Sequence, residues 1–197
     1  MTTTLRGTHV TLRPLTVDDA ELTLRWRQGD RAALLNRGAV TVEQQAAWIT
    51  ARPESEVNFV IELASGEPVG MLSLVGIDRA NRHAEPARFL IGEPDLVRGI
   101  PAAVEAMRLL YAFAFDELHL HRVHGTIAAD NRLMVKWQTF LGMREEGVLR
   151  QHYFIGGVFH DAVVVGMLEE EYRAVTVPRM NALIGRSRST SGQPEGS

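Results

Sequence analysis

One loop in this sequence combines residue types that bind anions. The loop follows a Gly-Glu-Pro turn, leads into an amphipathic segment and reads Arg98-Gly99-Ile100-Pro101-Ala102-Ala103. The first backbone N–H groups of a helix lack partners within the helix and carry the positive end of its dipole, so this place favours negative charge. Gly99 permits close approach to the backbone, and Arg98 adds a charge-assisted contact. The 98–103 loop is therefore a candidate anion site.

Pro101 is the unusual member of the loop, because proline has no backbone N–H and one donor is missing. A lost hydrogen bond to a charged group costs about 1.5–3 kcal/mol if nothing replaces it. The first turn of a helix also accepts proline for purely structural reasons. Since Ile100, Ala102 and Ala103 keep their N–H groups, we expect the loop to bind in a weakened or altered form.

Other chemistry-bearing patterns are weaker. His119, His121 and His124 lie close together, but without acidic or thiolate residues at fitting spacing they are more typical of a polar approach to a strand than of a metal site. The sequence contains no HExxH, GxSxG or GxxxxGK[ST] motif, so three common enzyme classes receive no support. We expect no metal.

The composition is that of an ordinary globular protein. The chain has 197 residues, of which 45% are hydrophobic, with a net charge of −3 and no cysteine. The length suits one domain, and the charge does not favour nucleic-acid binding. The absence of cysteine excludes disulfides, thiolate zinc sites and cysteine nucleophiles. No leader or membrane-spanning run is evident. We expect a cytoplasmic protein that binds neither nucleic acid nor membranes.

Hydrophobic periodicity and turn residues predict seven strands and four helices. Thr16 and Thr41 are expected N-caps, Ser65-Gly66 and Gly156-Gly157 are expected hairpin turns, and Gly142 suits a helix end. Strands are expected at 9–13, 58–63, 69–77, 84–92 and 122–130 and on both sides of Gly156-Gly157, and helices after Thr16 and at 41–48, 101–118 and 131–142.

These elements predict a mixed α/β fold, with one domain over residues 1–180. The polar, turn-rich segment at 181–197 is expected to be a disordered tail.

Taken together, the motifs resemble the GNAT N-acyltransferase superfamily over roughly residues 5–172. The 98–103 loop follows the family pattern Arg/Gln-x-x-Gly-x-Gly/Ala, and Asn131 is followed eleven positions later by Gly142 and then Met143. Residues 144–168 are similar to the closing hairpin of the branch with ribosomal-protein, polyamine and amino-sugar acetyltransferases, and 24–28 to the first helix of amino-sugar members. The resemblance implies a mostly antiparallel sheet of about seven strands flanked by about four helices.

The resemblance also implies transfer of an acyl group from acetyl-CoA or another acyl-CoA to a primary amine. The 98–103 loop would bind the pyrophosphate of coenzyme A, and Asn131 the pantetheine arm, although Asn131 is equally suited to cap a helix. An alkyl amine titrates near 10.4 and a thiol near 8.5, so the amine must lose a proton and the thiolate can need one. Glu85 is the candidate base, with an exposed strand-end glutamate as the alternative.

The proton donor is harder to assign. Many relatives have Tyr seven residues after the Asn and some have Ser three after it, where this sequence has Gln138 and Met134, which cannot donate a proton usefully. Tyr153 and His152 are possible substitutes, although packing on a strand is the better explanation of both residue types. Tyr153 is retained as a catalytic candidate and His152 as a substrate contact, with solvent as a further source of the proton.

The acceptor is left open by the sequence. Trp26 and Arg27 are candidates for the acceptor pocket, with a core Trp and a solvated Arg as the alternative. An amino sugar, a polyamine, an antibiotic and a protein N-terminus all fit. Pro101 and the residues at 134 and 138 also support an alternative function, a GNAT-fold acyl-CoA-binding or regulatory module without catalysis. A third hypothesis is an enzyme that uses a bulkier acyl donor or a carrier protein. A homodimer is common among relatives.

Overall fold

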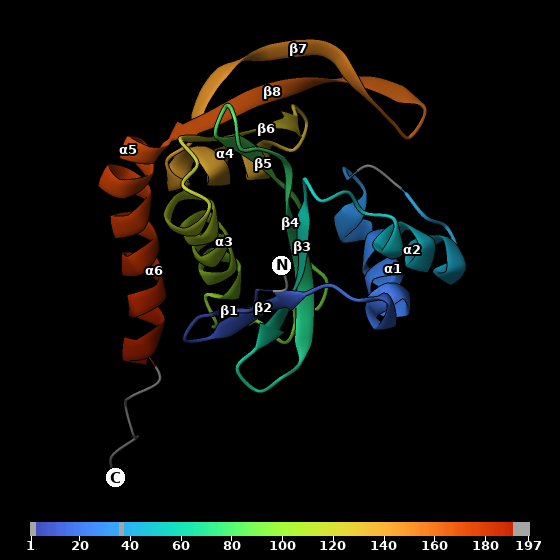
Figure 1. Ribbon diagram of the computed structural model, residues 1–197, viewed down its shortest axis with the longest axis horizontal. Coiled ribbons are helices and arrows are strands. Elements are labelled where there is room, and N and C mark those ends of the chain that lie inside the picture. Colours follow the sequence, from blue (N-terminus) through green and yellow to red (C-terminus); the bar gives the residue numbers. More distant parts are fainter. Residues whose placement is uncertain (1–2, 36–37, 191–197) are drawn as a thin grey trace.

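A computed structural model describes residues 3–35 and 38–190. Its centre is an eight-stranded sheet in the order β1-β2-β3-β4-β5-β6-β8-β7 (Figure 1). Neighbouring strands are antiparallel except β5 and β6. The strands are β1 Leu5–Arg6, β2 Val10–Pro14, β3 Val57–Leu63, β4 Pro68–Asp78, β5 His83–Ile91, β6 Arg122–Ala128, β7 Arg144–Ile155 and β8 Val158–Leu168. The predicted mixed, mostly antiparallel α/β fold is confirmed, with the short β1 as an additional strand.

Helices cover both faces of the sheet. On one face lie α1 (Ala20–Gln28) and α2 (Val42–Thr50), and on the other lie α3, α4 and α6 (Figure 1). Short 3-10 turns at Val17–Asp19 and Asp30–Ala32 flank α1. The remaining helical segments are α3 Ala102–Ala112 with its π-helical extension Phe113–Glu117, α4 Arg132–Leu141, α5 Glu169–Glu171, the π-helical turn Tyr172–Thr176 and α6 Val177–Thr190.

Two hydrophobic clusters separate the sheet from its helices. Strand alternation sends Ile61 and Leu72 into the cluster beneath α3, whereas Val60 and Met71 enter the cluster beneath α1 and α2. Every one of these four side chains is fully buried. The central strands β3 and β4 are therefore buried on both faces, which fixes their register and the positions of the strands beside them.

The local stop and start signals act as expected. The Thr41 hydroxyl accepts a hydrogen bond from the Gln44 N–H at 3.3 Å, as an N-cap does. Gly142 ends α4 with φ 121°, and Gly156 and Gly157 turn the last hairpin with φ 61° and 84°. Because such angles favour glycine, these residues determine where the two elements end.

The C-terminal segment differs from the expected irregular tail. Residues 181–190 continue α6, while 191–197 lie outside the described residues. The helical region is held by long-range packing: Tyr172 stacks on Phe115 with ring centroids 4.5 Å apart, and Met180 is fully buried. No helix in the described part of the chain is long and apolar enough to cross a membrane.

The sheet opens between β5 and β6. Their parallel ladder pairs His83 with Arg122 and Ala84 with Val123, and within the described residues it ends there. Pro86 follows in β5 and has no N–H to donate to a neighbouring strand. The two strands therefore separate in the middle of the sheet and leave room between them.

Candidate active site

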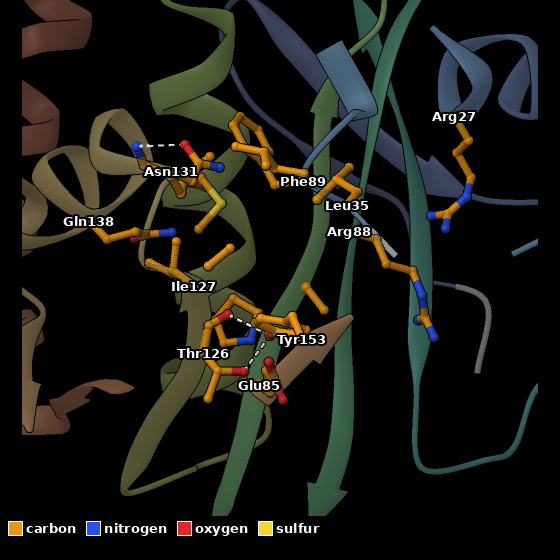
Figure 2. Close-up of a pocket in the computed structure, with 16 residues that line it drawn as sticks. Arg27, Leu35, Glu85, Arg88, Phe89, Thr126, Ile127, Asn131, Gln138 and Tyr153 are labelled. Carbon is orange, nitrogen blue, oxygen red and sulfur yellow. Dashed lines mark hydrogen bonds between the residues drawn. The ribbon is translucent and has the colours of Figure 1, made fainter. Parts of the chain in front are cut away.

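A cavity of about 300 Å³ occupies the opening between β5 and β6 (Figure 2). It takes residues from both strands, from α3 and α4, from α1 and the segment after it, and from the outer strand β7. Its lining residues are Arg27, Leu34, Leu35, Glu85, Pro86, Ala87, Arg88, Phe89, Met107, Thr126, Ile127, Ala128, Asn131, Met134, Gln138 and Tyr153. We call it the β5–β6 cavity.

A β-bulge shapes the β5 wall of this cavity. The pairing of β4 with β5 shifts between Ser73 opposite Ala87 and Met71 opposite Leu90, so that two residues of β5 face one of β4. Arg88 lies in this bulge with φ 55°. A bulge disrupts the ladder locally and re-aims its side chains, and bulges are frequent beside active sites. Backbone groups of β5 are therefore released from the sheet at the cavity wall.

Glu85 is the acidic residue of the β5–β6 cavity. Its carboxylate lies over β6, since a Cβ added to Gly125 would be 3.4 Å from Glu85 Oε1. Burial raises the pKa of Glu85, and this rise outweighs the opposing effects of the Thr126 N–H, which donates to the carboxylate, and of the charges on Arg88 and His152. A carboxylate with a raised pKa beside a cavity is suited to accept a proton. The structure thus places the predicted base at the cavity.

Tyr153 also reaches the cavity, although it comes from the outer strand. Its hydroxyl lies 2.6 Å from Thr126 Oγ1 and donates to the Thr126 carbonyl at 3.2 Å. Figure 2 shows Tyr153, Thr126 and Glu85 grouped together in the lower part of the cavity. His152 is exposed and does not line the cavity; its ring contacts that of Tyr153 at 4.8 Å between centroids. Of the two candidate proton donors, the structure brings Tyr153 alone to the cavity wall.

Gln138 occupies the position where many relatives have tyrosine. The sequence did not predict its burial or its hydrogen-bond partner. The side chain is buried, and its Oε1 accepts a hydrogen bond from the Tyr111 hydroxyl at 3.0 Å. Full burial raises the pKa of Tyr111 above its usual range, so this hydroxyl stays protonated and donating. Met134 lines the same wall. This wall therefore offers an amide and a thioether.

Asn131 performs the capping role and lines the cavity at the same time. Its Oδ1 accepts the Met134 N–H at 3.2 Å at the start of α4 (Figure 2). The oxygen is thereby directed toward the helix, and the amide nitrogen remains as the group that can donate to a ligand. Both interpretations made from the sequence are compatible with this geometry.

The 98–103 loop lies at the start of α3 and differs in two details from expectation. Pro101 is the N-cap residue, and Ala102 and Ala103 begin the helix with N–H groups that have no intrahelical acceptor. The Ile100 N–H donates to the Val97 carbonyl at 3.0 Å, so it is engaged in a turn and is not a ready donor to a ligand. Gly99 has φ 73°, with no atom within 4 Å of an added Cβ.

Arg98 points into solvent beside this loop. Its guanidinium pairs with Asp95 at 2.8 Å, and the two side chains are 83% and 82% exposed. Such an exposed pair contributes little to stability, so Arg98 can exchange this carboxylate for a phosphate at small cost.

A buried carboxylate that the sequence did not reveal anchors the start of α3. Glu105 accepts hydrogen bonds from the backbone N–H groups of Thr8 at 2.9 Å, His9 at 2.6 Å and Val10 at 2.8 Å. It is 5% exposed, and a Cβ on Gly7 would lie 2.7 Å from its carboxyl carbon. The turn before β2 is thus fastened to the first turn of α3.

Trp26 and Arg27, both candidates for the acceptor pocket, separate in the structure. Trp26 is buried in the cluster beneath α1 and α2, where its Nε1 donates to Glu93 at 2.8 Å and its ring fills the space a side chain at Gly92 would need. It does not line the β5–β6 cavity, and its burial matches the alternative of a core Trp. Arg27 does line the cavity, and burial, followed by the charge of Arg88, lowers its pKa.

Comparison with known proteins agrees with this geometry. Residues 9–144 match the family described as Acetyltransferase (GNAT) domain. The chain belongs to this family.

Individual relatives give the same picture. "Probable N-acetyltransferase YjcK" of Bacillus subtilis is 29% identical over 179 residues, which cover 85% of this chain and 98% of that protein. The spermidine N(1)-acetyltransferase of Escherichia coli is 29% identical over 121 residues, 61% of this chain and 63% of the relative. A GCN5-related N-acetyltransferase from Brucella melitensis superimposes with a TM-score of 0.81 at 23% identity, covering all of this chain and 92% of that one, which establishes the fold.

GNAT enzymes use acetyl-CoA, and the described residues offer fitting groups: a helix start with available N–H groups, a glycine with open space before it and an opening between two strands. Among those residues, no group of three or more His, Asp or Glu is arranged to hold a metal ion.

Proposed function

We propose that this GNAT protein is an N-acyltransferase that moves an acetyl or other acyl group from acyl-CoA to a primary amine of a small molecule or a protein N-terminus. The observation that carries this proposal is the half-buried Glu85 at the cavity between β5 and β6. A carboxylate in such a place can remove the proton that blocks an amine from attack.

The acyl donor would be held by backbone groups. The N–H groups of Ala102 and Ala103 and the open space at Gly99 would receive the pyrophosphate, and Arg98 would add its charge. The pantetheine arm would lie between the separated strands, with the Asn131 amide nitrogen as a donor. The released backbone of the Arg88 bulge would orient the thioester carbonyl.

The reaction then needs three proton movements. Glu85 takes a proton from the ammonium form of the acceptor, directly or through a water molecule. The amine nitrogen forms a bond to the thioester carbon and gives its second excess proton to water, the carbon–sulfur bond breaks, and the thiolate leaves with the bonding pair. The Tyr153 hydroxyl, or solvent, supplies a proton to the thiolate, whose usual pKa near 8.5 makes this step favourable at neutral pH.

A second candidate is an acyl-CoA-binding module without transfer activity. The observation that favours it is the Gln138 wall, where an amide bonded to Tyr111 stands at the position from which relatives donate a proton. It differs from the first candidate in a single measurable property, since both bind acyl-CoA and only the enzyme releases free coenzyme A with an amine.

The test combines calorimetry with a colorimetric assay of free thiol. Because the chain contains no cysteine, every thiol detected comes from coenzyme A. We expect acetyl-CoA to bind with micromolar affinity and an amine panel to give amine-dependent thiol release, which Glu85→Gln lowers at least 100-fold. The control is Glu117→Gln, an exposed glutamate at the end of the α3 extension. Binding without thiol release for any amine would favour the second candidate, and absence of binding by acetyl-CoA, by longer acyl-CoAs and by free coenzyme A would contradict both.

A further inference from the structure

A second hollow of about 460 Å³ adjoins the β5–β6 cavity on the side of α2. Two residues, Arg27 and Arg88, line both spaces. The hollow is lined by Arg27, Gly38, Ala39, Gln44, Gln45, Trp48 and Arg88, and we call it the arginine hollow. Within the described residues, its charged groups are the two guanidinium groups, and no Asp or Glu lines it.

Arg88 is held rigidly in this hollow. Its Nη1 donates to Glu56 Oε2 at 3.2 Å and to Asn58 Oδ1 at 3.1 Å. Its guanidinium lies over the Trp48 ring, 5.0 Å from the centroid. These contacts fix the guanidinium plane before any ligand arrives, which lowers the entropy cost of binding.

Arg27 reaches the same place from α1. Figure 2 shows its side chain directed toward that of Arg88. Burial lowers the pKa of Arg27, and the positive charge of Arg88 lowers it further, because the two guanidinium groups repel each other. An arginine stays protonated under these conditions, so an anionic group placed between the two guanidinium groups would lower their repulsion. The guanidinium of a third arginine, Arg52, lies 5.9 Å from the centroid of the same Trp48 ring.

Negative and positive side chains therefore lie in different parts of the space formed by the β5–β6 cavity and the arginine hollow. Glu85 stands in the β5–β6 cavity, where the amine must lose its proton, and the arginine pair stands where that cavity meets the arginine hollow. Glu56, the residue before β3, pairs with Arg88 at 3.2 Å and does not line the hollow. An acceptor with a positive end and a negative end matches this division, whereas a second ammonium group would meet guanidinium groups.

We propose that the acceptor is a primary amine that also carries a carboxylate or phosphate group, and that Arg27 and Arg88 bind this anionic group while the amine lies beside Glu85. The inference rests on the proposed function, since it names the acceptor class of the same site. It separates this chain from a relative that acts on spermidine, a polycation.

The experiment compares amines that differ in the anionic group. The thiol assay is run with 4-aminobutyrate against butylamine, and with phosphoethanolamine against ethanolamine, with spermidine as the polycation. We expect kcat/KM to be at least tenfold higher for the anionic amine than for the neutral amine in one of the two pairs. A preference in the first pair would identify a carboxylate as the bound group, and a preference in the second pair would identify a phosphate. Equal values in both pairs, or a preference for spermidine, would overturn the inference while leaving the proposed function intact.

Variants then locate the anion site. Arg27→Gln is expected to lower kcat/KM for the anionic amine at least tenfold more than for its neutral partner, and Arg27→Lys to keep part of the preference. Arg25→Gln, from the exposed face of the same helix, is the control and should keep the full preference. A loss shared equally by anionic and neutral amines in both Arg27 variants would overturn the assignment. If no amine releases thiol, calorimetry of 4-aminobutyrate and phosphoethanolamine against the coenzyme A complex tests the site without catalysis, and absence of binding by both would overturn it.

Discussion

The hydroxyl groups of Tyr153 and Thr126 lie 2.6 Å apart and connect the outer strand β7 to the strand that borders the cavity. The contact bypasses β8, which lies between β7 and β6 in the order of the sheet. The outer hairpin must therefore curl back over the sheet, as Figure 1 shows for β7 and β8. Tyr153 is in this way both a structural tie and a candidate proton donor.

Two variants separate these roles. Tyr153→Phe and Thr126→Val both remove the hydroxyl contact, and each should destabilise the fold by about 1 kcal/mol. If Tyr153 donates the proton, Tyr153→Phe alone lowers kcat, by 10- to 100-fold. The measurements are thermal unfolding and thiol release at saturating substrates. Equal changes of kcat in the two variants would leave Tyr153 with a purely structural role.

The activity should depend on pH through Glu85. Burial raises the pKa of this carboxyl above its usual 4.5, and only the ionised form accepts a proton. The value of kcat/KM should therefore rise with pH through the raised pKa, and this acidic limb should disappear in Glu85→Gln. The pH profile of kcat/KM checks the prediction. An unchanged limb in the variant would assign the titration to another group, such as the acceptor amine.

Glu85→Gln should not weaken the fold at neutral pH. A carboxyl whose pKa is raised on folding binds protons more tightly in the folded state, so its ionisation opposes folding above that pKa. Replacing it with a neutral amide removes this cost. The free energy of unfolding, measured by urea denaturation at pH 7.5, should be unchanged or slightly higher, and a large loss would mean that the carboxylate is structural.

Gly99→Ala tests the conformation of the 98–103 loop. Alanine at φ 73° costs about 1 kcal/mol, and with open space around the position the cost is conformational rather than steric. A methyl group there would also hinder a pyrophosphate from approaching the backbone, so acetyl-CoA affinity should fall at least tenfold. Gly66→Ala is a matched control, since Gly66 has φ 98° and equal space in the β3–β4 turn. It should lose similar stability and keep its acetyl-CoA affinity.

Two substitutions of Asn131 distinguish capping from ligand binding. Asp caps a helix as well as Asn does, whereas Ala does not and costs about 1 kcal/mol. Asn131→Asp should therefore keep its stability and lose acetyl-CoA affinity, because it lacks the amide donor. Asn131→Ala should lose both. Calorimetry and thermal unfolding provide the readouts, and full acetyl-CoA affinity in the Asp variant would restrict Asn131 to capping.

Glu105→Gln should destabilise the protein strongly. The glutamine amide offers a single acceptor oxygen to three N–H donors and places its own NH₂ among them. A loss of about 2–3 kcal/mol follows, which lowers Tm by roughly 5–10 °C for a chain of this size. Glu117→Gln serves again as control. A Tm within 1 °C of the wild type would show that the anchor at the start of α3 contributes little.

The sequence predicted most of the sheet because its signals are local. The β-forming residues at 58–63 and 69–77, the cap at Thr41 and the glycines at 142, 156 and 157 each act through neighbouring residues. The helical segment at 177–190 was not predicted, because what stabilises it is the burial of Met180 and the stacking of Tyr172 on Phe115, more than 50 residues away along the chain. Val177, Met180 and Leu183 do pack on the core, but this short apolar pattern beside a proline and a polar end is too weak to predict a helix without the tertiary packing.

The site was predicted in part for a similar reason. The resemblance indicated Glu85 and Asn131, with Tyr153 as a possible substitute for the missing proton donor, but no local pattern tells that Trp26 faces the core while Arg27 faces the cavity. Glu105 stands where the helix dipole favours an acid, yet its hydrogen-bond partners lie more than 90 residues earlier. The pairing of Tyr111 with Gln138 likewise joins α3 to α4 through the fold alone.

The short ladder between β5 and β6 has a consequence for the lifetime of the protein. Only two residue pairs join β5 to β6 within the described residues. A ligand that contacts both strands would therefore stabilise the connection between the two halves of the sheet. A ligand that binds only the folded state, at 100 times its Kd, adds about 2.7 kcal/mol to the free energy of unfolding. The supply of acyl donor would then govern how long the molecule survives heat and proteolysis as well as how fast it works.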